Sequence, residues 1–208
     1  IVVKADSAIN TVEDLQDKRV SVGEEESGTE QNAKQILAAY GLNDSIVDEV
    51  NLDYSNAAEE LKEGKIDAFF CTAGAQTTAI GELAKKCNIR LLNIDKKGAE
   101  KLKKTYKFYT DCTIPKETYN GQTEDVQTVG VKAVLLASDK LSANTVKDIT
   151  KILFKNKQEL QYALPVDISL DEKSAVEGIT IPFHKGAAAY YEECGIDAEE
   201  LTTEKGSN

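Results

Sequence analysis

Two short loops rich in glycine and hydroxyl residues carry the side chains best suited to binding chemistry. The first contains Ser27, Gly28 and Thr29, and the second contains Thr72 and Gly74. Hydroxyls and the free N–H groups at a helix N-terminus donate hydrogen bonds, and the positive end of the helix dipole favours an anion. The loops therefore predict a site for an anionic group such as a carboxylate. The simpler alternative is that Ser27 caps its helix and Gly74 permits a turn.

Each of these loops follows a predicted strand and precedes a predicted helix. Residues 19–23 alternate like a half-buried strand, and residues 66–71 form a continuous apolar run typical of a strand buried on both faces. If the strand order is 2-1-3, the two loops meet at the topological switch point, where ligands bind in such sheets. The expected ligand-binding residues are Ser27, Gly28, Thr29, Asn32, Thr72, Ala73 and Gly74.

The three glutamates at residues 24–26 and the single histidine each allow two interpretations. Residues 24–26 are three glutamates, which either complement the helix dipole at the surface or face the ammonium group of a ligand. An amino acid would satisfy both the loops and the glutamates. His184 is the only histidine, and a turn or cap role is favoured over catalysis because no partner Ser or Cys can be placed beside it.

The cysteines give no metal or redox motif. They have no CxxC spacing and no paired histidine, so they are either free, mostly buried thiols or include one disulfide: Cys71, Cys87, Cys112 and Cys194. Cys71 ends a predicted strand, where a nucleophile of a hydrolase would sit, but no activating base is indicated. A P-loop lysine and a GxGxxG motif are also missing, so the sequence predicts no metal, nucleotide or other cofactor.

Composition and charge narrow the class of protein. The 208 residues suit one or two domains, with 41% hydrophobic and 29% charged residues. The net charge of -11 disfavours binding to nucleic acid and to anionic membrane surfaces. No apolar run approaches the roughly 20 residues that span a bilayer. Because the sequence opens at Ile1 and contains no Met, we expect a processed product or a fragment.

The order of predicted elements indicates an α/β fold. Strands alternate with helices up to residue 114, including an alternating strand over residues 50–54 and a helix that Ser55 caps. This pattern predicts a doubly wound parallel sheet with helices on both faces. Residues 126–137 form a long extended segment, and the remainder is mostly helical, with Ser142 capping one helix.

The same residues resemble a known family. The sequence is similar to the TAXI group of TRAP-transporter solute receptors, which deliver small organic anions to a sodium-driven transporter. No single motif is diagnostic, but their order and spacing extend over nearly the whole chain: residues 3–7 before the KRVSVG strand, Ser27-Gly28-Thr29, Asp67-Ala68-Phe69-Phe70, Thr72-Ala73-Gly74-Ala75, Thr113-Ile114-Pro115 and residues 179–186.

The resemblance implies a fold and a function. It implies a two-lobed, type II periplasmic-binding-protein-like fold that binds a small carboxylate, such as glutamate or a related amino acid or organic acid, in an interlobe cleft. The protein would be an extracytoplasmic receptor, periplasmic or lipid-anchored, with the membrane subunits of a TRAP system as partners and no enzymatic activity. The alternatives are a ligand-sensing or adhesive surface module that is not coupled to transport, or a Cys71-dependent hydrolase.

The resemblance also implies a division into lobes. Residues 11–128 would form the α/β ligand-binding lobe, and residues 1–10 and 129–208 would supply hinge strands and the helical part of the other lobe. The Gly-rich opening of that other lobe has no counterpart in this sequence. Its helices would therefore lose part of the surface they pack against, and we expect either self-association or a partner segment that completes the lobe.

Overall fold

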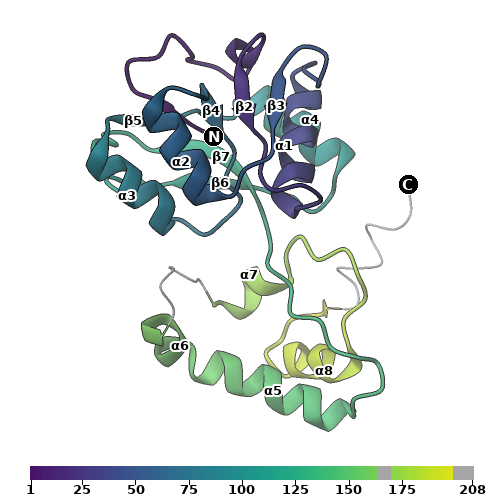
Figure 1. Ribbon diagram of the computed structural model, residues 1–208. Coiled ribbons are helices and arrows are strands. Elements are labelled where there is room, and N and C mark those ends of the chain that lie inside the picture. The colour runs from purple at the N-terminus through teal and green to yellow at the C-terminus, as the bar shows by residue number, and fades with distance from the viewer. Residues whose placement is uncertain (164–169, 199–208) are drawn as a thin grey trace. The chain divides into compact units, whose positions relative to one another are not determined.

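The computed structural model describes residues 1–163 and 170–198, which divide into two compact units (Figure 1). Unit 1 comprises residues 1–105 and 111–130, and unit 2 comprises residues 106–110 and those from 131 onward. In the described part of unit 2 the elements are helices apart from the ends of two strands, so the predicted α/β lobe with a mostly helical remainder is confirmed.

Unit 1 is built on a mixed sheet. Its strands lie in the order β3-β2-β4-β1-β5, with these bounds: β1 Val2–Lys4, β2 Arg19–Ser21, β3 Asp48–Val50, β4 Ala68–Phe69 and β5 Ile89–Leu91. Strand β2 pairs in parallel with both β3 and β4, which confirms the predicted 2-1-3 order of the first three crossover strands. The switch point therefore lies between β2 and β4.

Strand β1 departs from the expected all-parallel arrangement. It runs antiparallel to both β4 and β5 and lies between them, with Val2 and Val3 fully buried. Only a short 3-10 helix, Glu13–Leu15, separates β1 from β2, so no crossover helix imposes a parallel direction. Residues 1–10 thus include a strand of this sheet. The lobe boundaries expected for a whole two-lobed protein stay a prediction.

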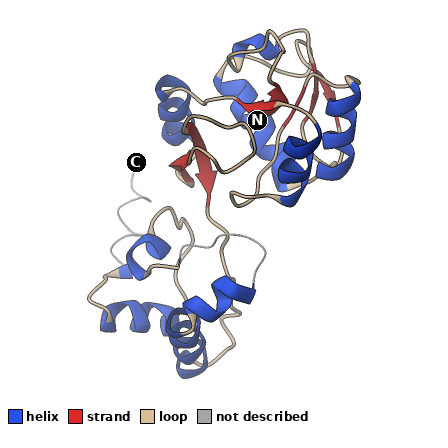
Figure 2. Cartoon of the chain, turned by 90° about the vertical axis from the view of Figure 1, so that its left-hand side faces the viewer, coloured by secondary structure: helices blue, strands red, loops and turns tan. Residues whose placement is uncertain are grey.

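Helices flank the sheet of unit 1 (Figures 1 and 2). Their bounds are α1 Gly28–Ala39, α2 Tyr54–Glu63, α3 Thr78–Lys86 and α4 Lys96–Thr105. Helix α2 packs against α3, and α1 packs against α4 on the other side of the sheet (Figure 1). Buried side chains of α2 and α3, such as Leu61 and Ile80, share a hydrophobic cluster with Phe69 of β4.

The start of α2 differs from the prediction. The alternation at residues 50–54 predicts a strand through Tyr54 with Ser55 as the helix cap, but β3 ends at Val50 and Tyr54 is the first helical residue. Asp53 is the N-cap, and its carboxylate accepts hydrogen bonds from the amides of Ser55 and Asn56. An aspartate at this position satisfies two otherwise unpaired N–H groups, which outweighs the short alternating pattern.

A two-stranded ribbon contains the boundary between the units. Strand β6 spans Tyr109–Ile114, strand β7 spans Val126–Val131, and the two pair with each other. The extended segment expected over residues 126–137 thus has only its first half in a regular strand. Val134, Leu135 and Leu136 lie beyond that strand with exposed side chains.

Unit 2 packs its helices around aromatic rings. Its described helices are α5 Ala143–Lys155, α6 Lys157–Ala163, α7 Glu172–Val176 and α8 Lys185–Glu193. Helix α5 packs closely on α8, where Phe154 stacks on Tyr190 and meets Tyr191 edge to face. Ser142 caps α5 as expected, accepting a hydrogen bond from the Thr145 amide.

Candidate functional site

The two predicted loops lie at the carboxyl ends of adjacent parallel strands. The first, loop A (residues 22–27), leads from β2 into α1, and the second, loop B (residues 70–77), leads from β4 into α3. Asn32 of α1 donates a hydrogen bond from Nδ2 to Thr72 Oγ1 at 3.3 Å. The side-chain contact between the first helix and loop B brings together two segments that are 40 positions apart in the sequence.

Tyr54 forms the closest connection between loop B and the first turn of α1. Its hydroxyl lies 2.6 Å from Thr29 Oγ1 and 3.0 Å from the Thr72 carbonyl oxygen, and it accepts from the Thr72 amide at 3.3 Å. Tyr54 comes from α2, which is neither of the predicted loops. Tyr54 is in the first turn of α2 because the N-cap is Asp53, two residues before the expected cap Ser55.

Ser27 has the capping role that the sequence offered as the simpler alternative. It is the N-cap of α1, and its Oγ accepts a hydrogen bond from the Glu30 amide at 3.1 Å. A hydroxyl that accepts one bond still holds its own proton, so capping and donation to a ligand are compatible. Gly28 is exposed at the first helical position, whereas the Thr29 side chain is buried.

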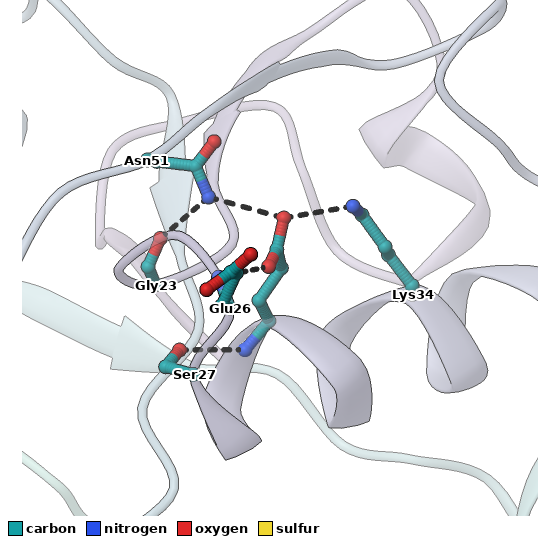
Figure 3. A network of polar contacts seen from close by, with 6 residues as sticks. Gly23, Glu26, Ser27, Lys34 and Asn51 are labelled. Atoms are coloured by element: carbon teal, nitrogen blue, oxygen red, sulfur yellow. Dashed lines mark hydrogen bonds and ion pairs between the residues drawn. The ribbon is translucent and has the colours of Figure 1, made fainter.

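The carboxylate of Glu30 fixes the shape of loop A (Figure 3). It accepts hydrogen bonds from the Glu26 amide, from Lys34 Nζ at 2.8 Å and from Asn51 Nδ2 at 3.3 Å. Asn51 also donates to the Gly23 carbonyl, so the same network spans both ends of the loop. Ser27 and Glu30 thus form half of a capping box: Ser27 accepts from the Glu30 amide, but the Glu30 carboxylate binds the amide of Glu26 in place of that of Ser27.

This network determines the ionisation of Glu30. The hydrogen bond from Lys34, reinforced by the Glu26 amide, holds the pKa of the Glu30 carboxyl below its ordinary value, although the side chain is buried. The same contact raises the pKa of Lys34. A carboxylate that stays ionised keeps accepting from all three donors, so it maintains the loop geometry at neutral pH.

Backbone conformation at loop A is restricted by two residues with positive φ. Gly23 has φ +101, and a Cβ there would lie 2.8 Å from the Thr29 side chain. Glu26 has φ +59, a conformation that L-residues rarely adopt, and its amide is the one bound by Glu30. Glycine is therefore required at residue 23, whereas Glu26 is held by its partner.

Loop B ends in a similar way. Gln76 has φ +67 and directly precedes Thr77, the N-cap of α3. Thr77 Oγ1 donates to the Gly74 carbonyl at 2.7 Å, and its amide donates to the hydroxyl of Tyr119. Residues 72–74 are exposed. The structure thus places all the predicted loop residues near the switch point, and their role in binding a ligand stays a prediction.

The three glutamates lie at the surface, and His184 has a structural role as a helix cap. Glu24, Glu25 and Glu26 have exposed side chains at the surface of loop A. His184 belongs to unit 2, where its Nδ1 accepts from the Gly186 amide and caps α8. The predicted cap role of His184 is confirmed.

The cysteines are free thiols, but they are less buried than expected. Cys71 and Cys87 are half-buried, while Cys112 and Cys194 are exposed. Burial raises the pKa of the Cys71 thiol, and its side-chain hydrogen bonds are with Thr77 and Tyr54. A thiol whose pKa is raised by burial is not activated as a nucleophile, so the hydrolase alternative gains no support.

Two features of residues 1–163 and 170–198 concern metal ions and membranes. No group of three or more His, Cys, Asp or Glu side chains in those residues is arranged to hold a metal ion. None of the helices in the same residues is long and apolar enough to cross a membrane.

Comparison with known proteins gives one family and several solved structures. The family described as NMT1-like matches residues 1–195. The periplasmic aliphatic sulphonate binding protein SsuA from Escherichia coli is 12% identical with a TM-score of 0.49, and the match covers 98% of this chain and 49% of that one.

Two further solved structures match the chain. The alkanesulfonate-binding protein SsuA from Xanthomonas axonopodis pv. citri, bound to MOPS, is 16% identical with a TM-score of 0.45, over 98% of this chain and 52% of that one. The substrate binding protein of an amino acid ABC transporter is 20% identical with a TM-score of 0.40, and the match covers 78% of this chain and 54% of that one. The chain spans about half the length of the solved proteins that it matches.

Proposed function

The chain belongs to the NMT1-like family, whose members are solute-binding proteins and not enzymes, and from that premise we propose that it is part of an extracytoplasmic solute receptor. In this proposal the receptor serves a TRAP-type transporter of the TAXI group, as the sequence resemblance implies. The ligand is a small carboxylate, either an amino acid such as glutamate or a related organic acid. The partners are that ligand and the membrane subunits of the transporter.

The observation that carries the proposal is the meeting of the two loops. Asn32 donates a hydrogen bond to Thr72, and Tyr54 links Thr72 to Thr29 in the first turn of α1, the helix that Ser27 caps. The N–H groups of the first helical turn lack intrahelical acceptors, and the hydroxyls of Ser27 and Thr72 retain protons for donation. A carboxylate accepts such bonds through both oxygens.

The direct test is a thermal-shift screen of the mature full-length protein. The panel contains the common amino acids and short organic acids, including L-glutamate. A ligand at 100 times its dissociation constant stabilises the folded state by about 2.7 kcal/mol. Failure of every compound would reject the proposed ligand class. Uptake of the bound solute in cells that lack the gene then tests the coupling to a transporter.

Two substitutions locate the site. Thr72→Ala and Ser27→Ala are each expected to weaken binding of the identified solute by about 1–3 kcal/mol, measured by calorimetry. Ser27→Ala also removes a helix cap, at about 1 kcal/mol of stability. Ser142→Ala removes the corresponding cap of α5 and is the matched control, because it should lower stability without changing affinity. Unchanged affinity in both loop variants would place the site elsewhere.

A further inference from the structure

The hydrogen bonds of Tyr54 can be assigned to individual protons. A phenol has one proton to donate, and this one is surrounded by three nitrogen and oxygen atoms in addition to the Cys71 thiol. The Thr72 carbonyl oxygen can only accept, and the Thr72 amide can only donate. The three contacts with nitrogen and oxygen are all satisfied when Tyr54 donates to the Thr72 carbonyl and accepts from the Thr72 amide and the Thr29 hydroxyl.

This assignment separates Thr29 from the other loop hydroxyls. Its proton is directed at Tyr54, and its side chain is 6% exposed, so the hydroxyl has no proton to offer a ligand. Thr72 Oγ1 accepts from Asn32 and keeps its own proton, and its side chain is exposed. Thr72 can therefore donate to a bound group, whereas the Thr29 hydroxyl is used inside the protein.

We propose that Tyr54 is a positioning residue that fixes loop B against the first turn of α1, through Thr72 on one side and Thr29 on the other. The ring is supplied by a third segment, α2, whose N-cap Asp53 sets the position of Tyr54. Both contacts of the hydroxyl with Thr72 are to backbone atoms, so they fix the path of the loop and leave the Thr72 side chain unaffected. The consequence for affinity rests on the proposed function, whereas the linkage between the two segments does not.

The linkage is tested on the ligand-free 208-residue chain by amide hydrogen exchange. Tyr54→Phe retains the ring and removes the hydroxyl. The expected result is exchange about fivefold to tenfold faster, both at loop B and in the first turn of α1, because one hydrogen bond contributes about 1 kcal/mol. Faster exchange at the Thr72 amide alone would overturn the proposal, since a local contact would explain it.

A double-mutant cycle and a matched tyrosine provide the controls. Thr29→Val combined with Tyr54→Phe should change exchange at loop B no more than Tyr54→Phe alone, whereas independent effects that multiply would overturn the linkage. Tyr40→Phe removes a hydroxyl of the same unit that binds Asp95. It should lower thermal stability without changing exchange at either loop.

Binding distinguishes failure of this inference from failure of the proposed function. With L-glutamate and L-glutamine as probes, Tyr54→Phe is expected to weaken binding about tenfold at an almost unchanged melting temperature. Binding equal to wild type would overturn the positioning role. If the wild type binds no member of the screen while exchange at the two segments is coupled, the proposed function fails and the linkage through Tyr54 stands.

Discussion

Units 1 and 2 bury their apolar side chains to very different extents. Among the described residues, every large hydrophobic side chain that is exposed lies in unit 2: Val134, Leu135, Leu136, Leu141, Ile149, Ile152 and Ile181. Unit 1 has a sheet that gives its helices a second layer to pack against. In unit 2, α5 and α8 bury the aromatic rings between them. An amphipathic stripe is therefore covered only as far as a neighbouring layer extends.

The sequence anticipated this difference only in part. The stripe of α5 was expected to lose packing surface, and Ile149 is indeed 42% exposed, but Val146 of the same stripe is buried. Tyr190 and Tyr191 of α8, expected to lose cover as well, are buried against Phe154. Self-association through the uncovered face stays a prediction.

The largest expected effect compares one truncation in each unit. Leu37→Ala in α1 removes a fully buried side chain and should lower the stability of unit 1 by about 2–5 kcal/mol. Ile152→Ala in α5 removes one that is 57% exposed, and should change stability by no more than about 0.5 kcal/mol. Urea unfolding, followed by exchange of the α1 and α5 amides, measures both. An equal cost would show that another surface covers Ile152 in solution.

A smaller effect is expected from substituting one closely packed helix glycine in each unit. A Cβ on Gly186 would lie 2.2 Å from the Ala143 carbonyl oxygen, whereas one on Gly98 would meet the tip of the Tyr40 ring. Because backbone cannot yield as a side chain can, Gly186→Ala should cost about 1–3 kcal/mol and Gly98→Ala about 1 kcal/mol. Circular dichroism during thermal unfolding gives both values.

Gly81 provides the control for these glycine substitutions. It lies in α3, and a Cβ there would meet no atom within 4 Å. Gly81→Ala should therefore be neutral or stabilise the protein by about 0.5–1 kcal/mol, since alanine favours helix. A Gly98→Ala variant less stable than Gly186→Ala would reverse the expected order of the two units.

The smallest effect concerns one carboxylate from each unit. The pKa of Glu30 is lowered by its bond from Lys34 and by backbone and amide donors, and the pKa of Glu193 is lowered by its bond from Lys147. A lowered folded-state pKa stabilises the protein above the ordinary value of 4.5, and this stabilisation is lost as the pH falls through the folded value. Glu30→Gln should thus lower the unfolding midpoint at pH 7.

The pH series then distinguishes the two carboxylates. The difference between Glu30→Gln and wild type should shrink as the pH falls below 4.5, because the wild-type carboxyl becomes neutral as well. Glu193→Gln should change the midpoint less at every pH, since that ion pair is exposed. A difference for Glu30→Gln that is constant with pH would show that the loss is steric and not ionic.

Local patterns predicted the elements and the two loops, because they depend on neighbours in sequence. The Ser27 cap and the 2-1-3 order each follow from a short segment or a general rule of sheets. Tyr54 was missed since its role depends on a contact with Thr29 and Thr72, which lie on other elements. The signal that could have found it is Asp53, which is as good an N-cap as Ser55 and comes before it in the sequence.

The place of β1 in the sheet has a consequence for the order of folding. Strands β2, β3 and β4 pair through short crossovers, but β5 joins the sheet only by pairing with β1. The partners of β1 are residues 68–69 and 89–91, far along the chain. Closing such long loops is slow compared with packing adjacent helices. We therefore expect the sheet to be completed in a late, non-local step. In that step residues 2–4 insert between β4 and β5, two strands that lie more than 60 residues further along the sequence.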